Sequence, residues 1–199
     1  ESKDNAQMLR AMISVIDACV ITEGFRTDRL PYFDAEYLFL NLRAKSVGEK
    51  VKMFYHHSQG VNMAGVPCDV STEVEINIED VKVDMSDKAS DKVMLNDTLG
   101  VQLRYPSIFD VIPNGKEEQT DEIDLVSRCV VHAYDNDEIY ESDTPDEAKK
   151  FIESLSSSQF AKIAEFFKTA PTLAHTFTYK CTGCGQEDQV TLKGIADFF

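Results

Sequence analysis

Two cysteines near the end of the chain have the spacing of a metal-binding turn. Cys181 and Cys184 stand in the stretch YKCTGCGQEDQVTLKG (179–194), between two segments with the alternating pattern of strands. Gly183 and Gly185 allow the backbone to curl so that its N–H groups face the thiolates. Such a C-x-x-C turn supplies two of the four ligands of a tetrahedral structural zinc site. A complete site therefore needs two more ligands from elsewhere in the chain.

An earlier segment matches this turn in register. In both segments a tyrosine stands two residues before the first candidate ligand, and a valine stands six residues after the second. The later segment has Tyr179, Cys181, Cys184 and Val190 in these places, and the earlier one has Tyr55, His57, Cys68 and Val74. Because Cys3His is an accepted structural zinc set, we predict one zinc site formed by His57, Cys68, Cys181 and Cys184. His56 is the substitute ligand if the strand is shifted by one residue.

The two turns differ in length, which leaves the nature of the site open. The stretch SQGVNMAGVP (58–67) separates His57 from Cys68 and is longer than the usual knuckle. Three interpretations therefore remain: a bound metal, ribbon-like hairpins without metal, and a redox-active C-x-x-C pair. The redox interpretation fits least, because Cys181 leads into a β turn and not into the helix start that would lower its pKa.

No other group of residues has the pattern of an active site. The chain lacks a P-loop, a dinucleotide-binding glycine motif and a nucleophile elbow. The acidic stretch 135–143 lacks the spacing and the glycine of a calcium loop. His132 follows an apolar helical pattern and is interpreted as structural, and His175 has no assigned role. We predict no catalytic residue and no enzyme activity.

The aromatic pair that ends the sequence is a candidate partner-binding feature. Phe198 and Phe199 would act as an anchor for a groove on another protein if they are exposed. The alternative is that they pack in the core and hold the C-terminal tail in place.

Charge and cysteine content restrict the partners and the compartment. The 199 residues contain 20 Lys and Arg against 35 Asp and Glu, a net charge of −15. This charge disfavours binding to bare nucleic acid or to an anionic membrane and allows a basic protein partner. No stretch reaches the roughly 18 apolar residues of a membrane span. Five cysteines, an odd number, favour a reducing compartment such as the cytoplasm.

The pattern of apolar residues predicts an α+β fold in which small antiparallel β hairpins of zinc-ribbon type combine with a helical lobe. We expect a single domain over residues 1–199, with helices in 1–48, a β block in 49–105 that forms one small antiparallel sheet, helices in 106–171, and a β knuckle with the C-terminal tail in 172–199. Within these parts the expected helices cover 5–22, 33–45 and 121–134, with Asp34 as an N-cap and Gly48 as a stop signal. Two further helices begin at capping signals, Thr144 and Ser156.

Several stretches together resemble a known family. FDAEYLFLNLRAKSVGE, EVEINIEDV, FIESLSSSQFAKIAEFFKTAPTL and YKCTGCGQEDQVTLKGIADFF are similar to the baseplate hub assembly family of T4-like contractile-tailed bacteriophages, over nearly the whole chain. The family tends to carry a cysteine pair in the earlier turn, where this chain has Cys68 with His57 opposite.

The resemblance implies a non-enzymatic late protein that binds other baseplate hub proteins, as a hub subunit or an assembly chaperone. It would act in the host cytoplasm and could remain in the tail baseplate of the virion, and its oligomeric state stays open. A zinc-ribbon adaptor or regulator that binds host or phage proteins is the alternative function.

Overall fold

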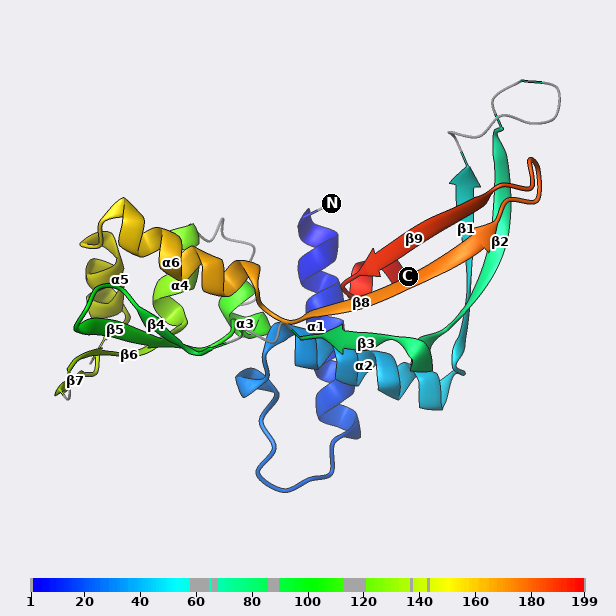
Figure 1. Ribbon diagram of the computed structural model, residues 1–199. Helices are drawn as coiled ribbons and strands as arrows, with labels where there is room; N and C mark the ends of the chain where they lie inside the picture. Colours follow the sequence, from blue (N-terminus) through cyan, green and yellow to red (C-terminus); the bar gives the residue numbers. More distant parts are fainter. Residues whose placement is uncertain are drawn as a thin grey trace. The chain divides into compact units, whose positions relative to one another are not determined.

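The protein has the predicted α+β class. The computed structural model describes residues 2–57, 65, 68–85, 90–112, 121–136, 138–142 and 144–198, and these form helices and small antiparallel sheets (Figure 1). By their internal contacts the residues group into two compact units. Unit 1 comprises Glu1–Ala35 and Met85–Pro171, and unit 2 comprises Glu36–Asp84 and Thr172–Phe199. The single domain expected over the whole chain stays a prediction.

Unit 1 combines helices with a four-stranded antiparallel meander in the order β4-β5-β6-β7. Its elements are α1 (Ser2–Cys19), η1 (Thr27–Arg29), the start of α2 (Tyr32–Ser46), β4 (Lys92–Met94), β5 (Leu99–Leu103), α3 (Ile108–Val111), α4 (Glu122–Arg128), β6 (Val130–Asp135), β7 (Glu138–Tyr140), α5 (Pro145–Glu153) and α6 (Ser157–Lys168). One apolar cluster joins the sheet to α4, α5 and α6 and consists of Leu95, Val101, Leu103, Val126, Ile152, Ile163 and Phe166.

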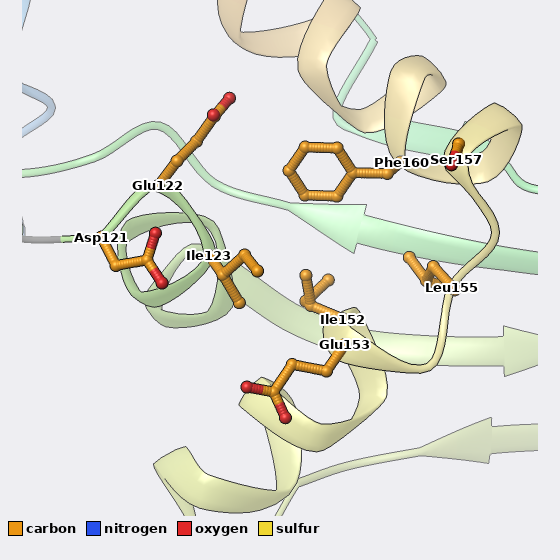
Figure 2. Close-up of a pocket in the computed structure, with 8 residues that line it drawn as sticks. All are labelled: Asp121, Glu122, Ile123, Ile152, Glu153, Leu155, Ser157 and Phe160. Atoms are coloured by element: carbon orange, nitrogen blue, oxygen red, sulfur yellow. The ribbon is translucent and has the colours of Figure 1, made fainter.

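The last two helices of unit 1 begin where the capping signals predict. The Thr144 hydroxyl accepts the N–H of Glu147 at the start of α5, and Ser156 forms a reciprocal capping box with Gln159 at the start of α6. Beside the start of α6 and the end of α5, the surface has a hollow of about 390 Å³ that residues at the start of α4 also line (Figure 2).

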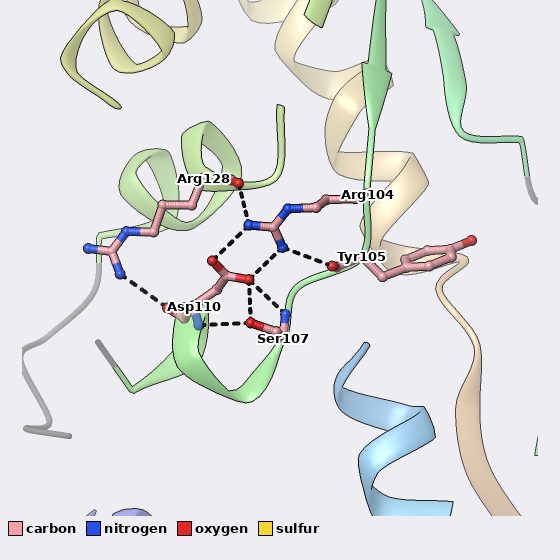
Figure 3. A network of polar contacts seen from close by, with 5 residues as sticks. All are labelled: Arg104, Tyr105, Ser107, Asp110 and Arg128. Carbon is pink, nitrogen blue, oxygen red and sulfur yellow. Dashed lines mark hydrogen bonds and ion pairs between the residues drawn. The ribbon is translucent and has the colours of Figure 1, made fainter. Parts of the chain in front are cut away.

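An ion pair with a buried carboxylate fixes the turn that follows β5. The Arg104 guanidinium donates to both carboxylate oxygens of Asp110, at 2.6 and 3.0 Å, and also to the carbonyl of Arg128 (Figure 3). The Ser107 backbone N–H and hydroxyl both donate to Asp110 Oδ2 at 2.8 Å. Burial raises the pKa of Asp110, but the bonds from Arg104 and Ser107 outweigh it and hold that pKa below its usual value.

Unit 2 is built around two antiparallel hairpins. Its elements are the rest of α2, β1 (Lys50–His57), β2 (Val70–Asn77), η2 (Ile78–Asp80), β3 (Lys82–Asp84), β8 (Thr172–Lys180), β9 (Glu187–Lys193) and η4 (Ile195–Phe198). Strands β1 and β2 form one sheet, and β3-β8-β9 form another. The buried Glu36 side chain of α2 accepts the backbone N–H of Ile195 at 2.8 Å, which attaches η4 to the start of α2 within the unit.

Several local predictions need correction. The strands of the 49–105 block are present, but they are divided among three sheets and do not form one. The helix expected over 121–134 ends at Arg128, and Val130–Asp135 is strand β6, because these residues pair with β5 and β7. Asp34 is not the N-cap of α2, since that helix already begins at Tyr32. Gly48 lies just beyond the helix with φ +130, as a stop signal requires.

Candidate metal centre

The two hairpins of unit 2 place three cysteines at their turns. Cys181 directly follows β8, whose last residue pairs with the first residue of β9, and Cys184 lies in the turn between these strands. Cys68 stands two residues before β2, at the end of the hairpin where His57 pairs with Val70. All three positions follow from the local strand pattern that the sequence predicts.

The three sulfur atoms lie close together. They are all within 4.8 Å of one another, and the Sγ atoms of Cys68 and Cys181 are 3.6 Å apart. All three thiols are free, Cys68 and Cys181 are buried, and Cys184 is half-buried. Zinc–sulfur bonds of about 2.3 Å in tetrahedral geometry separate the sulfurs by about 3.8 Å. The cluster therefore needs only a small contraction to become three corners of a tetrahedral site.

Close packing between the hairpin turns brings the cysteines together. A Cβ atom at Gly183 would lie 2.5 Å from Val70 Cγ2 and 3.0 Å from Cys68 Sγ, so only glycine fits there without displacement. The Thr182 N–H donates to Thr72 Oγ1 at 3.1 Å, and the two threonine hydroxyls are 3.2 Å apart. These contacts hold the C-x-x-C turn against the start of β2.

Aromatic packing extends the same contact along the strands. The ring of Tyr55 on β1 lies 5.5 Å from that of Tyr179 and 5.4 Å from that of Phe177, both on β8. Tyr55 and Tyr179 are the two residues whose equivalent positions define the register match between the segments. The match therefore corresponds to a physical contact between the hairpins.

The surroundings of the sulfurs favour unequal protonation. Backbone N–H groups of Cys184 and Gly183 face the Cys181 sulfur and lower its pKa, against the effect of burial. Burial raises the pKa of Cys68, and its hydrogen bond with Cys181 acts in the same direction. Of these two thiols, Cys181 is therefore the readier to act as a thiolate. Its pKa is lowered by the turn itself, which corrects the expectation that a helix start would be needed. Thiolates are soft ligands that suit zinc, copper(I) and iron–sulfur clusters, so the arrangement can hold a metal ion of this class.

A family comparison matches the entire chain. The family described as T4 bacteriophage base plate protein matches residues 1–199. The chain belongs to this family. No curated protein and no solved structure matches it. The resemblance that the sequence suggested is thereby confirmed at the level of a T4-like base plate protein, a structural component of the phage tail. No helix in the described part of this base plate protein is long and apolar enough to cross a membrane.

The base plate protein brings together three of the four predicted ligands. His57 is the last residue of β1, and its side chain lies outside the described residues. His56 is exposed, its Nδ1 is 3.1 Å from Asp69 Oδ1, and it lies outside the three-cysteine cluster. The fourth ligand stays a prediction.

For Phe198 in the aromatic end of the base plate protein, the structure fits the alternative of core packing. Phe198 is only 1% exposed and belongs to the core of unit 2, which argues against a role as an exposed partner anchor. Phe199 lies outside the described residues. Of the other histidines, His132 is in strand β6 and not at the end of a helix, and His175 is in β8 as expected.

Two buried carboxylates were not found by sequence reasoning. Glu36 and Asp110 are both buried and hold the backbone of η4 and the turn after β5, respectively. The chain has 35 acidic residues, and no local pattern distinguishes Glu36 from the rest. For Asp110, the spacing Ser107-x-x-Asp110 was an available signal, because it is a capping box.

Proposed function

We propose that this protein is a non-enzymatic tail protein that binds other hub proteins while the central hub of the base plate is assembled. It acts as a hub subunit or as an assembly chaperone. The match of the base plate family to all 199 residues carries this proposal. The family description supports a structural role in the tail, and the hub as the place of action rests on the resemblance of the stretches around 33–49 and 179–199.

The charge of the chain supports a role in assembly. A net charge of −15 keeps a protein soluble and disfavours self-association before its partners arrive. It also favours partners with basic surfaces. The protein therefore acts in the host cytoplasm during assembly, and as a hub subunit it would remain in the base plate of the finished tail.

The three-cysteine cluster serves the fold in this proposal. Cys68, Cys181 and Cys184 bind a structural zinc ion, with His57 as the fourth ligand. The ion joins the β1–β2 turn to the β8–β9 turn, where Gly183 and the two threonines already keep them in contact. Since structural zinc sites are closed, this one contributes stability and no chemistry.

Recovery of partners from infected cells tests the hub function. The tagged protein would be expressed in host cells during infection, purified at successive times, and its partners identified by mass spectrometry. We expect base plate hub proteins among them. A purification that recovers no tail protein at any time would contradict the proposal. Purified phage particles then separate the two roles, because a hub subunit is present in the particle and a chaperone is absent.

A zinc-ribbon adaptor or regulator is the second candidate function, and the cysteine cluster at the hairpin turns is the observation that favours it. Such a protein would bind host proteins or phage proteins outside the tail. The same purification distinguishes the two, since an adaptor would recover non-tail partners in amounts that exceed the hub proteins.

A further inference from the structure

The hollow beside α4, α5 and α6 in unit 1 has an apolar floor. Ile123, Ile152, Leu155 and Phe160 line it, and Ile152 belongs to the core cluster against which the other three pack. Figure 2 shows Ile152 between Ile123 and Leu155, with the ring of Phe160 directed toward Ile123. The volume of about 390 Å³ is within the range of about 300–1,000 Å³ that is typical of binding pockets. A large apolar side chain fits the shape and the chemistry of this floor.

The charged groups at the rim of the hollow are all acidic. Asp121, Glu122 and Glu153 line it and are exposed, and no lysine or arginine is among the lining residues. The neighbouring Lys149 pairs with Asp124 at 2.6 Å and is also attracted by Glu153 and Asp121, so it offsets part of the three rim charges. Within the described ranges, none of the three rim carboxylates forms an ion pair of its own. The rim therefore presents negative charge to any group that enters.

The helix start beside the hollow does not favour an anion. Ser157 is the first residue of α6, and helix N-termini often attract phosphate or carboxylate groups. Here the side chains of Ser156 and Gln159 form the capping box and accept the backbone N–H groups of Gln159 and Ser156, respectively. With three carboxylates nearby, the hollow selects for positive charge.

We propose that this hollow is a docking site for a segment of a partner protein that inserts an apolar or aromatic side chain next to lysine or arginine residues. This docking site rests on the proposed function, and it specifies the chemistry of the protein's partner. A second copy of the chain is a poor occupant, because its net charge of −15 would bring like charge to the acidic rim. A basic segment can pack its apolar side chain on the floor of the hollow, and its lysine or arginine residues are attracted to the acidic rim.

Short overlapping peptides that cover the other base plate proteins of the phage are the probes. They are arrayed and tested with the full-length protein, and the strongest binder is then measured in solution by fluorescence anisotropy. We expect the bound peptides to share an apolar residue beside lysine or arginine. Replacing that apolar residue by alanine should weaken binding by about thirty-fold or more, as for a buried hot-spot side chain.

Charge reversal in the protein provides the matched test. The double variant Glu122→Lys/Glu153→Lys should weaken the peptide by about tenfold, and the wild-type affinity should fall as salt is raised. The control Glu141→Lys/Glu165→Lys makes the same change of charge at exposed positions outside the hollow and should bind nearly as the wild type does.

The outcomes separate this inference from the hub function. Equal weakening by both double variants would mean that only the overall charge matters, and it would overturn the docking site. Absence of any bound peptide, or binders without basic residues, would also overturn it. In each of these cases hub proteins recovered from infected cells would still support the proposed function, whereas failure of that recovery would contradict the function itself.

Discussion

Replacement of Gly183 by alanine is the sharpest test of how the hairpins of unit 2 meet. Gly183 is not among the glycines with positive φ, so alanine can adopt its backbone conformation. At such a position the change normally stabilises a protein by about 0.4–1 kcal/mol, because it restricts the unfolded chain. A loss of stability in Gly183→Ala would therefore come from contact with the neighbouring hairpin, and not from strain in the backbone at residue 183.

The distances around Gly183 predict how much Gly183→Ala should destabilise the protein. The new methyl carbon would lie 2.5 Å from Val70 Cγ2 and 2.8 Å from Val70 Cβ, while carbon atoms in contact prefer about 3.5–4.0 Å. The two turns must separate by about 1 Å, or Val70 must leave its rotamer. Overpacking of this kind costs about 1–3 kcal/mol. For a chain of this length the corresponding fall in melting temperature is about 2–12 °C.

Thermal unfolding and zinc content together provide the assay. Gly183→Ala should melt at lower temperature and hold less zinc, because the same methyl group displaces Cys68 from Cys181. The double variant Val70→Ala/Gly183→Ala removes the closest clashing atom, so it should be more stable than the sum of the single changes predicts. A Gly183→Ala protein that is as stable as the wild type, or more stable, would refute the packing of the two turns.

Three further predictions concern other contacts. Cys184→Ala in a zinc-loaded sample should release zinc and lower the melting temperature, while the exposed Cys19→Ala should change neither; unchanged zinc content would rule the site out. Asp110→Asn should lose about 1–3 kcal/mol in urea unfolding at neutral pH. Since its pKa is lowered by folding, that stability is present above the unfolded value of about 4 and disappears as pH falls through the folded value, so the variant and the wild type should converge in acid. Glu36→Ala should cost about 1–3 kcal/mol and reduce hydrogen-exchange protection in η4, with a smaller loss for Glu36→Gln, which keeps an acceptor.

Local patterns predicted the parts of the metal centre because each part depends on nearby residues. Alternation of apolar and polar residues identified the strands on both sides of each turn, and the equivalent places of Tyr55 and Tyr179 indicated that the hairpins meet in register. The convergence of Cys68 with Cys181 and Cys184 follows from that register. Capping signals at Thr144 and Ser156 succeeded for the same reason, since a cap involves only residues within one turn.

The failures arise where a distant partner decides the structure. A period of two indicates a strand but does not identify the sheet in which it pairs, so the 49–105 block was interpreted as one sheet. Val130 and Val131 fit a helical pattern as well as a strand, and pairing with β5 and β7 selects the strand. For Phe198 the sequence left an exposed anchor and a core position open, and only its contacts with distant residues bury it.

The geometry of the cysteine cluster fits a structural use of zinc-type ligands better than a catalytic one. A catalytic zinc site keeps one coordination position open to substrate. Here Cys68 and Cys181 are buried, and the turn beside them has no room for a single methyl group at Gly183. Changes at the cluster should therefore act through the stability of the two hairpins and of the strands they connect. The acidic hollow of unit 1, which is accessible and has an apolar floor, is the better candidate for contact with another protein.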